Sequence, residues 1–324
     1  MSEALLQVED LRVAFAVGGR EIRAVDGVSY RVEPRQTLAI IGESGSGKTV
    51  GCRAIMGLLP ATAAISGSAQ LLGSELIGLS DAQLRKYRGS AMAMVFQDPA
   101  RSLNPTMRVG SQITEALRTH RKMSRSEAHT EAVELLRLVR IPAPERRYHE
   151  YPHQLSGGMR QRVMIAIALA CGPELLIADE PTTALDVTVQ AEIIDLMAEL
   201  CAAKGTAILM ISHDLGLVAN MCRRVAVMYA GRIVESQVAG AIFATPRHPY
   251  TQGLVDSLPR LGERSRRGQQ RLREISGVVP SIAAYPSGCR FNPRCPAVTD
   301  ICRSTAPEIT ALPADGLVRC HHHG

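Results

Sequence analysis

The sequence predicts an α/β fold in which short buried strands end in polar motifs and lead into helices. Three apolar runs carry this prediction, residues 37–41, 175–178 and 206–211, because each is long enough for a buried strand and is followed by polar residues. Residues 50–56 and 187–201 follow two of these runs with helical patterns. A length of 324 residues allows a large α/β domain and a smaller second part.

Other stretches extend the predicted fold on both sides of these strands. Residues 6–15 alternate apolar and polar positions and residues 28–32 continue with a second strand, which suggests an antiparallel β flank. Residues 91–96 form another apolar run that predicts a strand. Helices are predicted over 109–121, 126–140 and 159–170.

A glycine-rich loop follows the predicted strand 37–41 and matches the pattern G-x-x-x-x-G-K-[ST] between a strand and a helix. Its backbone N–H groups and the helix N-terminus favour bound phosphate. Lys48 is expected to reach the β- and γ-phosphates, and the Thr49 hydroxyl suits Mg²⁺. The loop comprises Gly42, Glu43, Ser44, Gly45, Ser46, Gly47, Lys48 and Thr49. It predicts a site for ATP and Mg²⁺.

Four polar residues at the ends of other predicted strands add to this site. Gln97 follows the strand 91–96 and places an amide near the Mg²⁺ and the attacking water. Asp179 is expected to hold the Mg²⁺ shell through water, and Glu180 beside it to polarise the attacking water. His213 follows another strand of the same core and is a candidate γ-phosphate contact.

A second candidate anion site lies at the start of the predicted helix 159–170. Ser156, Gly157 and Gly158 precede this helix, so its backbone N–H groups and its dipole favour phosphate. Two phosphate-binding helix ends serve one nucleotide only if two copies face one another. The sequence therefore predicts ATP held between two cassettes.

Composition and charge limit the class of protein. No run of 18 uninterrupted apolar residues is present, so we expect no membrane span. Residues 1–10 lack a basic region followed by an apolar core, so we expect no signal peptide. Both observations favour a cytosolic location. The net charge is +6, but much of it lies within residues 260–273, where Arg264, Arg266, Arg267 and Arg271 crowd together. That stretch is a solvated linker or a patch facing phosphate or lipid. Only 3% of the residues are aromatic and none is Trp, which argues against a nucleic-acid partner.

The eight cysteines divide into two groups. Cys52, Cys171, Cys201 and Cys222 are scattered among apolar neighbours, as core residues are. Cys289, Cys295, Cys302 and Cys320 cluster near the end of the sequence, which in a cytosolic protein favours metal over disulfides. Thiolate sets select zinc or an iron–sulfur cluster, and the spacing leaves both open. His321, His322 and His323 are either substitute ligands or a solvated tail.

Taken together, these motifs resemble those of the ATP-binding cassette (ABC) ATPases over about residues 5–235. The resemblance identifies 42–49 as Walker A, Gln97 as the Q-loop, 155–159 as the signature and 175–179 as Walker B. It further implies that Asp186, after Ala184 and Leu185, is the D-loop residue, that His213 is the switch histidine and that Phe15 stacks on adenine. The signature usually ends in Gln, whereas Met159 stands here. The implied fold is an ABC-type P-loop ATPase with an antiparallel β flank and a helical signature subdomain.

Residues 241–251, including Pro246, His248, Pro249 and Tyr250, resemble the C-terminal extension of oligopeptide, dipeptide and nickel importer ATPases of the DppD/OppD type. Residues 96–105 and 179–191 resemble the same subfamily. This resemblance implies an ATPase domain over 1–240 with a helical subdomain at about 98–170, and a small cysteine-rich extension over 241–324. It also favours a [4Fe–4S] cluster on the four C-terminal cysteines, with zinc as the alternative.

The resemblance implies an ATP-hydrolysing subunit that drives uptake of dipeptides and oligopeptides. Its expected partners are a second, related ABC ATPase subunit in a heterodimer, two membrane permease subunits and an extracytoplasmic substrate-binding protein. The expected location is the cytoplasmic face of the inner membrane. Nickel, glutathione or opines are alternative cargoes, and an exporter cassette or a soluble ABC ATPase acting on DNA or ribosomes are rival functions.

Overall fold

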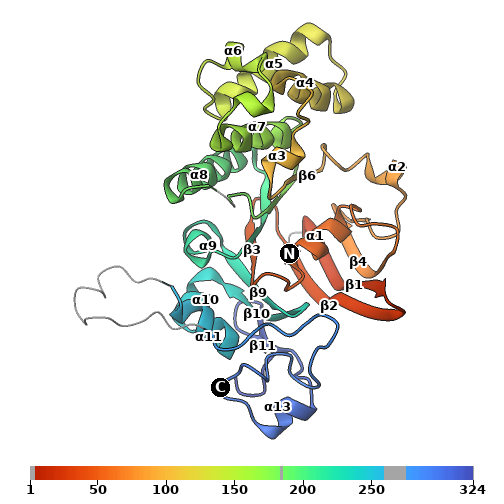
Figure 1. The fold of residues 1–324 in the computed structure, drawn as a ribbon, viewed down its shortest axis with the longest axis vertical. Helices are drawn as coiled ribbons and strands as arrows, with labels where there is room; N and C mark the ends of the chain where they lie inside the picture. The colour runs from red at the N-terminus through yellow and green to blue at the C-terminus, as the bar shows by residue number, and fades with distance from the viewer. Residues whose placement is uncertain (1–3, 183–184, 259–274, 324) are drawn as a thin grey trace, which may run out of the picture. The chain divides into compact units, whose positions relative to one another are not determined.

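The structure, a computed structural model, describes residues 4–182, 185–258 and 275–323 (Figure 1). The chain divides into two compact units, which we describe one at a time. The first comprises Met1–Leu6, Val32–Gln36 and Gly78–Ile211, and the second comprises Gln7–Arg31, Thr37–Ile77 and Ser212–Gly324.

The first unit combines buried parallel strands with a group of helices. Strands β6 (Met92–Val95), β7 (Leu175–Asp179) and β8 (Ala207–Ser212) lie in the order β8-β7-β6. Both pairs are parallel, and every residue of the three strands is buried. The longer helices are α4 (Val109–His120), α5 (Arg125–Leu138), α7 (Gly157–Leu169) and α8 (Val187–Lys204). Shorter ones are α2 (Asp81–Leu84), α3 (Pro99–Ser102), α6 (Pro144–Tyr148) and a 3₁₀ turn at Pro152–Gln154.

Side chains at the helix ends explain where these helices begin. Ser124 accepts a hydrogen bond from the Glu127 N–H, and Glu127 bonds back to the Ser124 N–H, so α5 starts with a capping box. Ser156 caps α7 and Asp186 caps α8. Gly205 ends α8 in a left-handed conformation, at φ 73°.

The second unit contains two sheets. One has four strands in the order β2 (Arg20–Val32), β1 (Leu6–Val17), β4 (Ala63–Leu71) and β5 (Ser74–Glu75). The other runs in the order β11 (Thr310–Leu312), β12 (Gly316–Val318), β10 (Arg232–Val238), β9 (Arg224–Tyr229) and β3 (Thr37–Ile41). Strands β3 and β9 are parallel, and the pairs β9/β10, β10/β12 and β11/β12 are antiparallel.

The helices of the second unit are α1 (Lys48–Ile55), α9 (Leu215–Met221), α10 (Ala239–Ala244), α11 (Pro249–Asp256) and α13 (Asp300–Ser304).

The pairing of β10 with β12 shows how the C-terminal segment attaches to its unit. Glu235 lies opposite Val318 in this antiparallel pair, and Val318 is fully buried. The cysteine-rich segment therefore returns to a strand that precedes it by about eighty residues. Its backbone extends the edge of a sheet, which anchors it through ladder hydrogen bonds.

The α/β prediction is confirmed, and the strand predicted at 37–41 has those bounds in the structure. The strand predicted at 28–32 is the end of a longer strand that begins at Arg20. The prediction missed its beginning because three of its first four residues, Arg20, Glu21 and Arg23, are charged and exposed. The strands at 63–71 and 232–238 were not predicted, since neither is a continuous apolar run. Cys52, Cys201 and Cys222 are buried as predicted, whereas Cys171 is half-buried. The arginine-rich stretch at 260–273 lies outside the described residues.

Within the described ranges, no helix combines the length and the apolar character that a membrane crossing requires.

Candidate nucleotide site

The glycine-rich loop joins β3 to α1, as its sequence pattern predicts. Gly42 has φ 154° and Gly47 has φ 101°, both in the region that disfavours other residues. A Cβ atom on Gly42 would lie 2.1 Å from the Met228 carbonyl oxygen, and one on Gly47 would lie 2.4 Å from that of Ala24. The backbone of Met228 and that of Ala24 leave no room for a side chain, so only glycine fits at these two positions.

Lys48 lies at the centre of this loop with 5% of its surface exposed. Its Nζ donates hydrogen bonds to the Gly42 carbonyl at 2.7 Å, the Glu43 carbonyl at 3.0 Å and the Ser46 hydroxyl at 3.3 Å. The loop therefore curls around a positive charge. Thr49, the second residue of α1, is half-buried. An ammonium held by neutral loop oxygens is well suited to exchange one of them for a phosphate oxygen.

Gln97 and Glu180, both in the first unit, lie in direct contact. The Gln97 amide nitrogen donates a hydrogen bond to Glu180 Oε2 at 2.9 Å. Glu180 follows the fully buried Asp179 at the end of β7 and has φ 46°, a strained conformation for a residue other than glycine. Its backbone N–H bonds the Ile211 carbonyl at 2.9 Å, which fixes the turn. The predicted base is thus held at the strand end with its carboxylate bound to an amide.

The second predicted anion site, in the first unit, is an exposed helix start. Ser156 is exposed, and its hydroxyl accepts a hydrogen bond from the Met159 N–H at 3.3 Å. A Cβ atom on Gly158 would lie 3.0 Å from Val189 of α8, so α8 covers this side of the turn. Gly157 and Gly158 are half-buried.

The remaining predicted residues of the nucleotide site differ in exposure and in their hydrogen bonds. Asp186 accepts a hydrogen bond from the Val189 N–H at 3.0 Å and thereby caps α8. His213 is exposed after β8, and Phe15 is half-exposed near the end of β1. Ala184 lies outside the described residues. Walker A, Phe15 and His213 belong to the second unit, and the other predicted nucleotide-site residues belong to the first.

Two residues that no sequence motif indicates, Arg294 and Tyr250, hold Glu43 of the glycine-rich loop. Arg294 Nη1 lies 3.0 Å from Glu43 Oε2, and the Glu43 N–H donates to the Tyr250 hydroxyl at 2.9 Å. Tyr250 is fully buried, and this burial is the main reason that its pKa is raised. A Tyr within the subfamily-like stretch 241–251 was the only available signal, and nothing in the sequence connects Arg294 with the loop.

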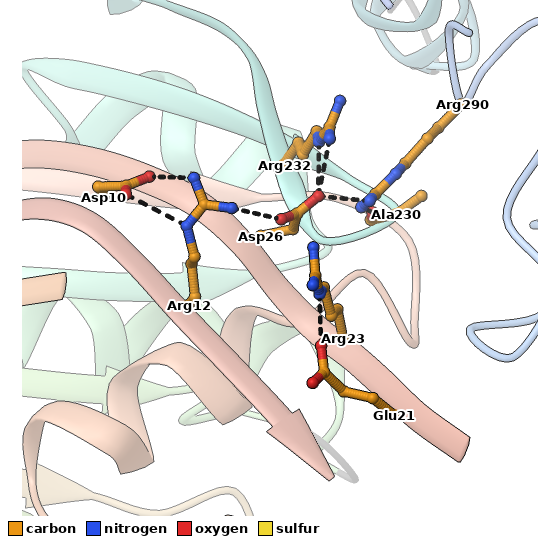
Figure 2. A network of polar contacts seen from close by, with 8 residues as sticks. All are labelled: Asp10, Arg12, Glu21, Arg23, Asp26, Ala230, Arg232 and Arg290. Carbon is orange, nitrogen blue, oxygen red and sulfur yellow. Dashed lines mark hydrogen bonds and ion pairs between the residues drawn. The ribbon is translucent and has the colours of Figure 1, made fainter. Parts of the chain in front are cut away.

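A network of ion pairs around Asp26 joins the four-stranded sheet to the C-terminal segment (Figure 2). Asp26 accepts hydrogen bonds from Arg12, Arg232 and Arg290, at 3.2, 2.8 and 2.5 Å. Arg290 Nη1 also donates to the Ala230 carbonyl. Burial alone would raise the pKa of Asp26, but the bond from Arg232 and the charges of the three arginines outweigh it and hold that pKa below its usual value.

The four C-terminal cysteines gather in one part of the second unit. The pKa of Cys289 is raised to about 11, mainly by burial and to a smaller extent by the nearby thiols of Cys302, Cys295 and Cys320. The Cys289 N–H bonds the Cys302 carbonyl at 2.9 Å, so two of the four are joined through the backbone. The structure therefore brings together residues that are spread over 32 positions of sequence.

Three of these sulfur atoms accept a hydrogen bond from the backbone N–H two residues further along the chain. The donors are Phe291, Ala297 and His322, for Cys289, Cys295 and Cys320 respectively. Such N–H donors favour the thiolate over the thiol. In the part of the chain that the structure describes, however, no group of three or more His, Cys, Asp or Glu side chains is arranged to hold a metal ion. The four-cysteine metal site stays a prediction.

Comparison with protein families finds two matches along this chain. The family described as ABC transporter matches residues 25–183, which include Walker A, Gln97, the signature and Walker B. The family described as oligopeptide/dipeptide transporter, C-terminal region, matches residues 234–302, which include three of the four clustered cysteines.

Several curated proteins are similar to this chain over almost its whole length. The probable peptide ABC transporter ATP-binding protein y4tR of Sinorhizobium fredii is 49% identical over 98% of this chain and 95% of that protein. The dipeptide transport ATP-binding protein DppD of Haemophilus influenzae is also 49% identical, over 98% and 95%. The oligopeptide transport ATP-binding protein OppD of Escherichia coli is 48% identical over 94% and 90%.

A solved structure shares the fold. The ATP-binding cassette MJ0796, in a dimeric post-hydrolysis state bound to ADP and phosphate, superimposes with a TM-score of 0.65 at 27% identity. The match covers 72% of this chain and 98% of that one. Together with the phosphate loop built around Lys48, these similarities place the chain among the ABC transporter ATP-binding proteins, and within them it belongs to the family of oligopeptide and dipeptide importer ATPases.

Proposed function

We propose that this ABC ATPase powers the uptake of dipeptides and oligopeptides through separate permease subunits. The glycine-rich loop closed around Lys48 is the observation that carries the nucleotide part of the proposal. The peptide part is supported by the names of relatives at 48–49% identity and by the matched C-terminal region. Nickel, glutathione and opines remain alternative cargoes, because selectivity resides in other subunits.

Each residue of the nucleotide site has a proposed role. Residues 42–49 bind the phosphates, and Phe15 stacks on the adenine. Thr49, Gln97 and Asp179 would hold Mg²⁺, and the bound ion would neutralise negative charge on the phosphates. Glu180 accepts a proton from the attacking water, with His213 near the γ-phosphate. The bond between Gln97 and Glu180 supports a resting state in which the amide holds the base.

We further propose that two cassettes bind ATP between them. The signature of one, Ser156 to Met159, would face the phosphates in the Walker A loop of the other, and Asp186 would lie at the junction. The exposure of Ser156 at the start of α7 supports this role. The second cassette is proposed to be a related chain. Two permease subunits and an extracytoplasmic binding protein complete the assembly at the cytoplasmic face of the inner membrane.

The proposed domain division places the ATPase domain at 1–240, with its helical subdomain at about 98–170, and the extension at 241–324. The two family matches, at 25–183 and 234–302, support separate origins for these parts. The pairing of β10 with β12 indicates that the extension completes a sheet of the ATPase domain instead of folding apart from it.

We propose that Cys289, Cys295, Cys302 and Cys320 hold a [4Fe–4S] cluster, with zinc as the alternative. The convergence of the four thiols and the three N–H donors to sulfur support this donor set. A bound cluster would supply cross-links between loops of a segment with little apolar content. The backbone bond from Cys289 to Cys302 helps to position the sulfur atoms, and the pairing of β12 with β10 attaches this segment to the sheet.

The catalytic assignment is tested with the assembled transporter in proteoliposomes. Glu180→Gln should retain MgATP and lose steady-state hydrolysis and uptake of a labelled dipeptide. The control is Glu174→Gln, an exposed carboxylate just before the opposite end of the same strand. Rapid hydrolysis by Glu180→Gln would contradict the assignment, and uptake of a nickel chelate in place of dipeptide would favour the alternative cargo.

The metal assignment is tested by anaerobic purification with iron, sulfide and zinc assays and a visible spectrum. About four irons and four sulfides per chain are expected for this type of cluster, lost in Cys295→Ala and kept in Cys171→Ala. Zinc alone would support the alternative, and a chain free of both would reject a metal site.

A further inference from the structure

The C-terminal extension contacts the phosphate-binding loop at Glu43. Arg294 Nη1 lies 3.1 Å from Glu43 Oε1 and 3.0 Å from Oε2. The Arg294 side chain is 4% exposed and that of Glu43 is 29% exposed. Water therefore screens this ion pair less than it would on an open surface.

Other contacts fix Arg294 before it meets the loop. Its Nε donates to the Ser276 carbonyl at 3.0 Å and its Nη2 to the Ile275 carbonyl at 3.3 Å. Its guanidinium also lies 5.8 Å from the centre of the Tyr229 ring, a cation–π distance. A guanidinium with this many fixed partners loses little further freedom when it binds a carboxylate.

The backbone of Glu43 is held as well as its side chain. Its N–H donates to the hydroxyl of Tyr250, which is fully buried in α11. Its carbonyl accepts from Lys48 Nζ at 3.0 Å. The extension thus holds the N–H and the carboxylate of the same residue whose carbonyl touches the phosphate-binding lysine.

We propose that Arg294 is a positioning residue for nucleotide binding, which acts with Tyr250 through Glu43 to keep the Walker A loop in its binding conformation. The proposal rests on the assignment of residues 42–49 as the ATP phosphate site. Without the ion pair, Glu43 can adopt more conformations. Lys48 then also becomes less fixed, because it is hydrogen-bonded to the Glu43 carbonyl. A smaller binding-competent fraction raises the apparent Kd in proportion.

This arrangement also connects the cysteine segment to the ATP site. Arg294 directly precedes Cys295, and Cys289 lies five residues before Arg294. Arg294 therefore links the cysteine-rich segment to Glu43 of the loop.

The test measures MgATP affinity in the full chain by displacement of a fluorescent ATP analogue. Arg294→Ala should raise the Kd about five- to tenfold, less than the loss of a charged hydrogen bond to the ligand itself, because Arg294 acts through Glu43. Arg294→Lys should recover part of the affinity because it keeps the charge. Arg303→Ala, the loss of an exposed arginine from the same segment, is the matched control and should leave the Kd unchanged.

A double-mutant cycle separates positioning from general stability. In a Glu43→Gln background, Arg294→Ala should cost little more, since the ion pair is already gone. In the assembled ATPase, Arg294→Ala should raise KM for ATP several-fold more than it lowers kcat. Should Arg294→Ala fail to fold, Arg294→Lys and Glu43→Gln carry the same comparison.

Three results would overturn the proposal: an unchanged Kd in Arg294→Ala, an equal loss in both backgrounds, or an effect on kcat alone. Absence of MgATP binding by the unmodified chain would instead reject the nucleotide site itself. The two failures are therefore distinguishable.

Discussion

The two helix starts that are proposed to meet ATP are built in opposite ways. At α1, glycines replace any capping side chain, and Lys48 is buried under the loop that precedes the helix. Buried side chains from the C-terminal extension support that loop. At α7, an exposed serine caps the helix with its own hydroxyl, and α8 packs against one side of the turn.

This difference indicates different tasks. A loop with fixed glycines, a central ammonium and support behind it is preorganised, so it can hold phosphate without further change. An exposed serine cap such as Ser156 would contact phosphate only when a second cassette brings its bound ATP to it. We therefore expect the α1 site to determine binding by a single chain, and the α7 site to determine turnover in the two-cassette assembly.

The largest effect is expected from Lys48→Ala. Loss of the ammonium removes the charge at the centre of the loop, and we expect turnover to fall about 10²- to 10³-fold, as on removal of other preorganised donors. MgATP binding by the single chain should weaken in parallel. Equilibrium binding and steady-state ATPase assays measure both, with the exposed Lys122→Ala as control. Normal binding by Lys48→Ala would invalidate the contrast between the two helix starts.

Asp26→Asn tests whether the support behind the α1 loop contributes to folding stability. The Asp26 N–H bonds the Gly231 carbonyl, and the Gly231 N–H bonds the Ser46 carbonyl of the loop, each at 2.9 Å. Asparagine would leave Arg232 and Arg290 without their shared buried carboxylate, which should cost about 3 kcal/mol of unfolding free energy. Urea denaturation measures this cost.

Asp10→Asn is the matched control for that change. Asp10 pairs with Arg12 in the same network, but 63% of its side chain is exposed. Exposed pairs contribute little, so the free energy of unfolding should stay within about 0.5 kcal/mol. Equal losses in the two variants would show that burial does not set the strength of this network.

Ser156→Ala should separate turnover from binding. In the two-cassette assembly, loss of a hydrogen bond to a charged phosphate should reduce turnover about 10- to 100-fold. In the single chain the Kd for MgATP should not change. Loss of the cap should also cost about 1 kcal/mol of stability.

Ser124→Ala provides the control, because Ser124 caps α5 with the same geometry and carries no proposed ligand. It should reproduce the loss of stability with normal turnover. A similar fall in turnover in both variants would mean that the effect of Ser156 is one of helix stability alone.

The sequence predicted these two regions unequally well. The strand 37–41, the glycine loop and the capped start of α7 follow from local patterns, since each needs only neighbouring residues to form. The link from Arg294 to Glu43 joins positions 251 residues apart, and no periodicity or composition indicates such a pair. The strand at 316–318 is equally hidden, because it has only three residues and pairs with β10, which is distant in sequence, as well as with β11.

The same reasoning explains which parts of the site the structure adds. Gln97 and Glu180 were assigned separately, each from its place at a strand end, and their contact at 2.9 Å depends on the parallel pairing of β6 with β7. The cysteines were grouped by density in the sequence, and the backbone bond from Cys289 to Cys302 depends on the fold of the loop between them. Local chemistry is predictable at these places, and tertiary partners are not.

The smallest effect is expected from the pH dependence of α11, the helix that carries Tyr250. His248 is 1% exposed and its Nδ1 accepts the Tyr250 N–H at 3.0 Å, so burial lowers its pKa to about 3. A histidine in the unfolded chain titrates near 6.5. Between these values the unfolded chain binds the proton and the folded chain does not, so stability rises with pH and is lost as the pH falls below about 6.5.

From pH 7 to pH 5.5 this group alone should therefore cost about 1 kcal/mol of unfolding free energy. His248→Asn keeps a side chain that can cap the helix but does not titrate, so it should lose about 1 kcal/mol less than the unmodified chain over this interval. Urea denaturation at both pH values measures the difference, and the exposed His153→Asn is the control. Identical pH dependence in all three chains would show that protonation of His248 is not coupled to unfolding. The α1 loop would then keep its support in mild acid, and its contrast with the exposed start of α7 would not depend on pH.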